Sequence, residues 1–194
     1  LTKYPSGGGD VLMGSIVTRS GELARTLKLS HMRLGTGVGA NDAEAVLRAL
    51  PSLPLRYQAQ DQAARRLAVW CAMQAPFSQV LHPAWTDAPG HAHWRNLCVT
   101  ADAPQGLAAG IFSVVMDERF TSSHVDLFCD SLKLFKIGYS WGGPMSLVMP
   151  YNLRSQRAMP TPHLKPGRVV RFCIGLEGVD DLQNDIAQAL QHLK

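Results

Sequence analysis

The sequence has no apolar run long enough to cross a membrane, no secretory signal pattern and no dense cluster of basic residues. Its 194 residues carry a formal net charge of only +4, and Arg65-Arg66 is the single adjacent basic pair. A nucleic-acid partner would call for a concentrated basic stripe or a base-reading motif. We therefore expect neither a membrane-spanning protein nor a nucleic-acid-binding one.

Cysteine is also scarce, and no C-x-x-C motif is present. The four cysteines are widely spaced in apolar surroundings: Cys71, Cys98, Cys129 and Cys173. This spacing favours buried, reduced thiols and a cytoplasmic location, and it indicates neither a zinc site nor a redox pair. His82, His91 and His93 lack matching acid or cysteine spacing, so we interpret them as loop residues and expect no metal.

Apolar residues are plentiful, at 46% of the chain, so a sizeable core can form. The patterns predict strands over 11–18, 110–116, 132–137 and 168–176, and helices over 20–34, 122–132 and 179–193. Another helix should begin at Asn41 or Asp42, stop at Pro51 and Pro54 and resume near Leu55. Its core-facing residues are expected to be Leu55, Ala59, Ala63, Leu67 and Cys71. This mixture predicts a small α+β domain.

Two glycine motifs suggest familiar functions without the structure that those functions need. Gly138, Ser140 and Gly142 form G-x-S-x-G, but a nucleophile elbow needs a helix after the serine, and Pro144 lies in its first turn. Residues 35–40 mimic a dinucleotide fingerprint, which belongs after a strand, whereas a helical pattern comes before it here. Serine hydrolysis stays open only as a minor alternative.

Arg171 lies between Val170 and Phe172 in the expected strand 168–176. An arginine in a buried strand is costly unless it meets an anion, and its two-pronged guanidinium suits a carboxylate. The alternative is an edge strand whose arginine reaches water. If the strand alternates, Val170, Phe172 and Ile174 face one way and Arg171 faces the other, toward Ser140 and Trp141.

Lys3 comes just before the glycine-rich residues 7–9. A lysine in this position can bind an aldehyde covalently, or it can be a solvated charge. The residues alone leave both interpretations open.

Four separated motifs carry a resemblance: TKYPSGGGDVLMGS, GIFS, GYSWGG and VVRFCIGLEGVDDL. Their order and spacing resemble the Cys/Met-metabolism family of pyridoxal-phosphate enzymes, and in particular the C-terminal half of its cystathionine β-lyases. The resemblance implies an α/β, fold-type I pyridoxal-phosphate-dependent transferase, of which this chain would be a fragment. Residues 1–50 would be the end of the large cofactor domain, with exposed apolar surface, and residues 51–194 the small α+β C-terminal domain.

The resemblance also assigns roles to individual residues. Lys3 would hold pyridoxal 5'-phosphate, Thr2 would touch the cofactor phosphate, and Arg171 would bind the substrate carboxylate. Ser140 and Trp141 would line the substrate site with Tyr139 nearby, and the expected catalytic residues are Lys3, Tyr139 and Ser140. Trp141 favours a β-lyase, since γ-enzymes of the family usually carry leucine there.

The implied reaction is cleavage of cystathionine to homocysteine, pyruvate and ammonia by a cytoplasmic homotetramer. The fragment alone would be inactive. Cysteine desulfhydrase, γ-lyase and γ-synthase activities remain alternatives within the family, and a non-catalytic folded domain is the alternative outside it.

Overall fold

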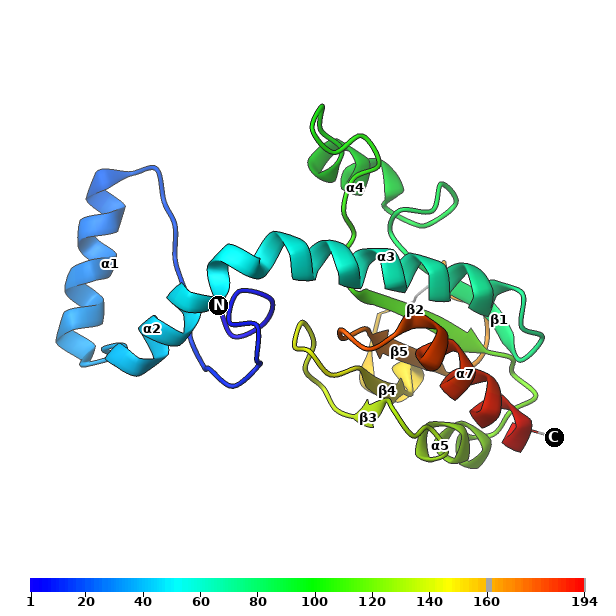
Figure 1. Cartoon of the computed structure of the whole chain (residues 1–194). Helices are drawn as coiled ribbons and strands as arrows, with labels where there is room; N and C mark the ends of the chain where they lie inside the picture. Colours follow the sequence, from blue (N-terminus) through cyan, green and yellow to red (C-terminus); the bar gives the residue numbers. More distant parts are fainter. Residues whose placement is uncertain (160–161, 194) are drawn as a thin grey trace.

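The computed structural model of the chain describes residues 1–159 and 162–193. Its centre is a five-stranded sheet in the order β1-β2-β5-β4-β3 (Figure 1). The strands are β1 (Phe77–Leu81), β2 (Ile111–Met116), β3 (Lys136–Ile137), β4 (Leu147–Tyr151) and β5 (Val169–Cys173). Neighbours are antiparallel except for β3 and β4, which are parallel. The expected strands at 110–116 and 168–176 are confirmed within a few residues at each end.

Seven α-helices and two short 3₁₀ turns occur in the described residues. The α-helices are α1 (Gly21–Leu34), α2 (Ala40–Ala49), α3 (Leu53–Ala72), α4 (His91–Cys98), α5 (Ser122–Asp130), α6 (Leu153–Gln156) and α7 (Val179–Leu190), and the turns are Leu50–Ser52 and Gln191–Leu193. The predicted helices over 20–34, 122–132 and 179–193 are confirmed apart from their ends. The 3₁₀ turn with Pro51 interrupts the chain between α2 and α3, where the two prolines were expected to break a helix.

The core lies between one face of the sheet and the helices α3, α5 and α7. On β5, Val170 and Phe172 are fully buried in this core, and Ile174 just beyond the strand is 1% exposed. Arg171 is only partly buried and is not part of the core cluster. Strand alternation therefore separates an apolar face from a face that can carry polar groups.

The strand expected over 132–137 shrinks to the two residues of β3. The reason is Asp185 of α7, which is 5% exposed and accepts hydrogen bonds from the backbone N–H groups of Lys133, Leu134 and Phe135 at 2.8, 2.8 and 3.3 Å. These donors are satisfied by a carboxylate and not by a neighbouring strand. The sequence pattern was apolar enough for a strand but gave no sign of this side-chain acceptor.

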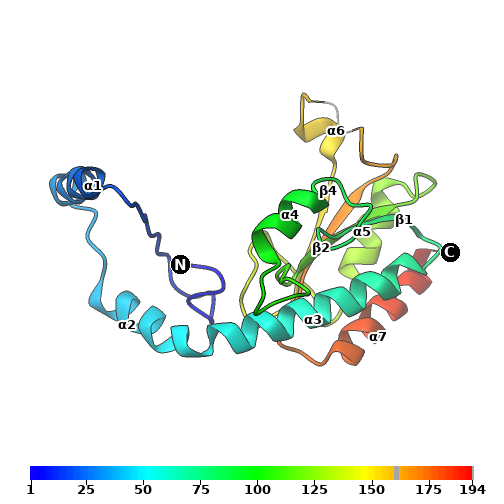
Figure 2. The same cartoon turned by 90° about the horizontal axis from the view of Figure 1, so that it is seen from above.

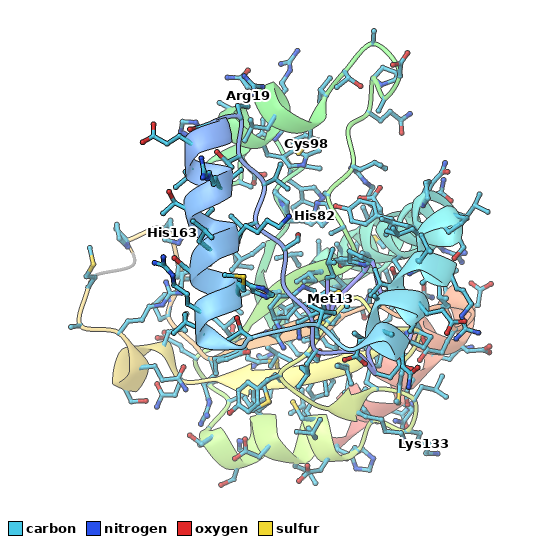
Figure 3. All side chains as sticks on the ribbon, turned by 90° about the vertical axis from the view of Figure 1, so that its left-hand side faces the viewer. Met13, Arg19, His82, Cys98, Lys133 and His163 are labelled. Atoms are coloured by element: carbon cyan, nitrogen blue, oxygen red, sulfur yellow. The ribbon has the colours of Figure 1, made fainter. Side chains whose placement is uncertain are left out.

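The predicted strand over 11–18 is wrong. The segment is extended but pairs with no strand in the described part of the chain, and Leu12 and Val17 are each 92% exposed. It leads to α1, which has no buried residue and lies away from the sheet in Figures 1 and 2. In Figure 3, Met13 and Arg19 mark the ends of a segment that runs alongside α1. The expectation of exposed apolar surface within residues 1–50 is thus confirmed.

Two helix predictions also need correction. α2 begins at Ala40 with Gly39 as its cap, so neither Asn41 nor Asp42 is the cap; Asp42 lies inside the first turn. In α3, Leu67 and Cys71 are buried as expected, but Leu55 is 71% exposed and Ala59 is also exposed. Figure 1 shows the cause, because the first half of α3 extends beyond the sheet.

The strand β1 and the helices α4 and α6 were not predicted from the sequence. The histidine-rich segment around residue 91 was interpreted as a loop, yet His91–Cys98 is helical, starting after Gly90 with φ of 82°. A preceding Pro-Gly pair concealed this helix. Among the described residues no cluster of three or more histidine, cysteine or acidic side chains could hold a metal ion.

All four cysteines are free, and Cys71, Cys129 and Cys173 are buried, whereas Cys98 is partly exposed. In the ranges that the structure covers, no helix combines the length and apolar character needed to cross a membrane.

Candidate active site

The lysine loop, residues 1–10, is a series of tight turns fixed by the extended segment that follows it. The backbone N–H of Thr2 donates to the carbonyl oxygen of Met13 at 3.1 Å, and the Thr2 hydroxyl accepts from the Met13 N–H at 3.0 Å. The Ser6 hydroxyl closes the turn by donating to the carbonyl oxygens of Thr2 and Lys3 at 2.8 and 3.1 Å. Lys3 therefore projects from a backbone with several internal restraints.

The Lys3 amine lies against the serine–tryptophan turn, residues 138–146, which joins β3 to β4. Its Nζ donates to Ser140 Oγ at 2.8 Å and lies 4.5 Å from the centre of the Trp141 ring. The amine makes no ion pair in the described part of the chain. The structure thus brings together Lys3, Ser140 and Trp141 as a set.

The turn approaches the lysine loop so closely that only glycine fits at one position. Gly142 has φ of 76°, and a Cβ built on it would lie 2.8 Å from the backbone nitrogen of Tyr4. No helix follows Ser140, because the chain continues through this turn into β4. The nucleophile elbow expected of a serine hydrolase is therefore missing from this described region, as Pro144 predicted.

Arg171 reaches the same turn from β5. Its Nη2 donates to the carbonyl oxygens of Gly138, Tyr139 and Ser140 at 3.2, 2.8 and 3.3 Å, and its Cζ lies 5.8 Å from the centre of the Trp141 ring. The predicted direction of this side chain, toward Ser140 and Trp141, is confirmed. Its Nε is buried and has no hydrogen-bond partner in the part of the chain that the structure describes. A guanidinium with an unused buried donor has capacity for a further acceptor such as a carboxylate.

Tyr139 and Thr2 stand apart from this group. The Tyr139 ring is 68% exposed and packs edge-on against Tyr151, with 6.3 Å between ring centres. The Thr2 hydroxyl accepts from the Met13 N–H and also donates to the Met13 carbonyl oxygen at 3.3 Å. To donate to a phosphate, it would have to exchange that long hydrogen bond.

Tyr4 links the lysine loop to the sheet, a role that the sequence analysis missed. Its hydroxyl accepts from the backbone N–H of Gly110, just before β2, at 3.0 Å, and its ring packs edge-on against Tyr57. Burial raises the pKa of Tyr4 to about 12, so its phenol stays protonated and does not serve as a base near neutral pH.

A buried acid–serine pair anchors the far end of the serine–tryptophan turn. Glu177 accepts from the backbone N–H and the hydroxyl of Ser146, both at 2.7 Å. Ser146 is fully buried, and its oxygen accepts from the Gly175 N–H at 2.9 Å. A serine beside apolar strand residues was the only sequence sign of this anchor, and its partner lies 31 residues away.

Cys173, two residues after Arg171, lies on the same face of β5. Burial raises the pKa of its thiol, and the nearby charges of Arg171 and Lys3 partly offset that rise. We assign it no catalytic task.

Within the described residues, the Lys3 amine has no acidic partner and lies beside the Ser140 hydroxyl, and the Arg171 guanidinium reaches the same turn. Such an arrangement is compatible with a lysine-dependent enzyme that acts on amino acids. The sequence profile of the Cys/Met metabolism PLP-dependent enzyme family matches residues 1–191. The chain belongs to this family, whose cofactor is pyridoxal phosphate, and it has the α/β fold of the family.

Individual relatives agree on the family and differ in their reactions. A cystathionine β-lyase of Bordetella avium is 31% identical over 97% of this chain and 46% of its own length. An L-alanine/L-glutamate racemase of Wolbachia pipientis is 30% identical over 100% of this chain and 46% of its own length. The crystal structure of cystathionine γ-synthase from Xanthomonas oryzae, in complex with aminoacrylate and cysteine, has a TM-score of 0.80 at 28% identity, covering 99% of this chain and 48% of that one.

The chain therefore spans about half the length of the curated relatives that it matches. The division at residue 50 remains a proposal. It accords with a core cluster that begins at Ala64 and includes no residue before it.

Proposed function

We propose that this chain is part of a pyridoxal-phosphate-dependent carbon–sulfur β-lyase that cleaves cystathionine to homocysteine, pyruvate and ammonia. The observation that carries the proposal is the convergence of the Lys3 amine and the Arg171 guanidinium on the same two residues, Ser140 and Trp141. An amine and a carboxylate-binding guanidinium that meet in this way suit an α-amino acid substrate.

The residues present fit the cofactor. Lys3 is an amine whose hydrogen bond is to a neutral hydroxyl, so no acid in the described residues competes for it. Thr2 offers a hydroxyl one residue away. Pyridoxal phosphate supplies an aldehyde for Lys3 and an electron-accepting ring that makes the substrate Cα–H acidic.

Each side chain then has a defined task. Arg171 binds the substrate carboxylate through its free donors and so fixes the direction of the Cα–H bond. Lys3 takes the proton from Cα, and Ser140 Oγ orients its Nζ. Trp141, 36% exposed, forms a wall of the substrate site and excludes water from it. Tyr139 stays a candidate for contact with the leaving group.

The test is product analysis with the full gene product, pyridoxal phosphate and cystathionine. β-Elimination gives homocysteine and pyruvate, whereas γ-elimination gives cysteine and 2-oxobutyrate, so chromatography of the oxo acids separates the two. We expect pyruvate and a yellow protein in which borohydride fixes the cofactor on Lys3. The Lys3→Ala variant should carry no such mass increment. Labelling of Ser140 by a fluorophosphonate in a colourless protein would refute the proposal.

A second candidate is amino-acid racemisation, favoured by the match of the whole of this chain to 46% of the Wolbachia racemase. Racemisation uses the same removal of the Cα proton and returns it to the opposite face. Chiral chromatography of L-alanine and L-glutamate after incubation with the protein tests it directly. D-Amino acids without pyruvate would favour racemisation, and a colourless protein with neither product would favour a non-catalytic domain.

We further propose a homotetramer in the cytoplasm. The exposed apolar side chains of the first 50 residues, such as Leu12 and Val17, support burial against other protein. Four free cysteines support a reducing compartment. Light scattering of the full gene product tests the assembly.

A further inference from the structure

Gln60 of α3 joins the core of the molecule to the serine–tryptophan turn. It is 1% exposed, and its Nε2 donates to the carbonyl oxygen of Gly143 at 2.8 Å across 83 residues of sequence. Gly143 lies two residues after Trp141, so this hydrogen bond holds the part of the turn that faces Lys3.

Arg56 makes the matching contact to the lysine loop from the preceding helical turn. Its Nη1 donates to the carbonyl oxygen of Tyr4 at 2.8 Å, next to Lys3. The Nε and Nη2 groups donate to Ser52 Oγ and the carbonyl oxygen of Ala49, both at 3.0 Å, so the guanidinium itself is fixed. Residues four apart on a helix lie about 6 Å apart along one face. One face of α3 therefore holds both loops of the site.

Gln60 is poorly explained as a stabilising core residue. Its Oε1 is buried and has no hydrogen-bond partner among the described residues, which destabilises the folded chain relative to a satisfied or an apolar group. An apolar side chain of the same size would avoid that cost. What an apolar side chain lacks is the donor for Gly143.

We propose that Gln60 is a positioning residue, which sets the place of Ser140 and Trp141 relative to Lys3 through its hydrogen bond to Gly143. Arg56 fixes the lysine loop in turn, through its hydrogen bond to the carbonyl oxygen of Tyr4. This inference rests on the proposed function for its kinetic consequence, but its structural consequence can be measured without catalysis.

The decisive variant is Gln60→Met, which keeps the side-chain volume, removes the donor and removes the unpartnered acceptor. The control is Gln62→Met, an exposed residue two positions along the same helix. Three quantities are compared in the full gene product: the melting temperature, the deuterium uptake of residues 138–146 and kcat/KM for cystathionine.

We expect Gln60→Met to melt at or above the temperature of Gln62→Met, because the unpartnered oxygen is gone. Deuterium uptake over residues 138–146 should rise at least twofold while that of β2 and β5 stays constant. A displacement of about 1 Å at a reacting group can cost about 100-fold, so kcat/KM should fall by at least about tenfold, mainly through kcat.

Unchanged uptake in the turn, or kcat/KM within twofold of the Gln62→Met control, would overturn the inference. So would a general rise in uptake with a lower melting temperature, since that indicates a merely structural role. If Gln60→Met does not fold, two polar variants provide the comparison. Gln60→His retains an N–H that can reach Gly143 and should preserve the turn, whereas Gln60→Asn is one methylene too short and should not. If Gln60→Met shows raised uptake over residues 138–146 but the wild-type protein has no lyase activity, the proposed function is refuted and the positioning role of Gln60 stands.

Discussion

The amine of Lys3 and the hydroxyl of Ser140 are 2.8 Å apart, although 137 residues separate them in the sequence. The hydroxyl is the hydrogen-bond acceptor that gives the lysine a fixed direction. Ser140 is consequently placed to orient an amine, and it lacks the following helix that would make it a nucleophile.

Replacing Ser140 by alanine should lower kcat for the β-elimination about tenfold while leaving KM nearly unchanged. The reason is that a hydrogen bond contributes up to about 1.5 kcal/mol, close to the free energy that corresponds to a tenfold change, and here it orients the proton-accepting amine. Steady-state kinetics measures both constants, with the exposed Ser123→Ala variant as control. A Ser140→Ala enzyme with normal kcat would show that Lys3 needs no such support.

Arg171→Lys should impair substrate use strongly and leave the cofactor absorbance intact. Lysine keeps the charge but loses the two-pronged geometry, and the loss of transition-state binding should be about 2–4 kcal/mol, or roughly 30- to 1,000-fold in kcat/KM. Arg48→Lys, on an exposed residue paired with Glu44, is the matched control. Near-normal catalytic efficiency in Arg171→Lys would mean that the carboxylate binds elsewhere.

Gly142→Ala should destabilise the protein by about 1–3 kcal/mol and reduce activity, because the added Cβ meets the backbone of Tyr4 in a left-handed conformation. Gly35 provides the control. It has a similar φ of 65° but open space around its Cβ position, so Gly35→Ala carries the conformational cost without the steric clash. Urea denaturation of both variants separates the two contributions. Equal losses would show that the loops are free to move apart.

His82 should make stability depend on pH between about 6.5 and 4. Burial, and then the charge of Arg65, lowers its pKa from 6.5 to about 4, and its Nδ1 accepts from the N–H of Ala84. The unfolded chain therefore binds the proton first as pH falls. Stability is complete above about pH 6.5 and declines toward pH 4, by about 3 kcal/mol in total.

Urea midpoints at pH 7.5, 6.0, 5.0 and 4.5 measure this slope, and His82→Gln should flatten it. His93→Gln, at an exposed position, should keep the slope of the wild type. An identical slope in the wild type and His82→Gln would assign the acid sensitivity to other groups.

Much of the candidate site was predictable because each part has a local sequence sign. Alternation in strand 169–173 predicted the direction of Arg171, and Pro144 predicted a turn after Ser140. The polar anchors were not predictable, since Gln60, Asp185 and Glu177 act on backbone groups 83, 52 and 31 residues away. The same cause explains why the strand predicted over 132–137 is shorter in the structure. Its apolar pattern suits a strand, but the backbone N–H groups of residues 133–135 donate to the distant carboxylate of Asp185.

The long sequence separation within the site has a consequence for synthesis. Lys3 meets Ser140 only after 137 further residues have been made, and Tyr4 meets Gly110 after 106. At about 5–20 residues per second, the first of these intervals lasts roughly 7–27 s. During that time the reactive amine is without its hydroxyl partner, and the apolar side chains of residues 12–17 are already outside the ribosome. The candidate site is therefore completed only after residues 12–17 have been made, and any chaperone that protects these apolar side chains acts on them before Ser140 is in place.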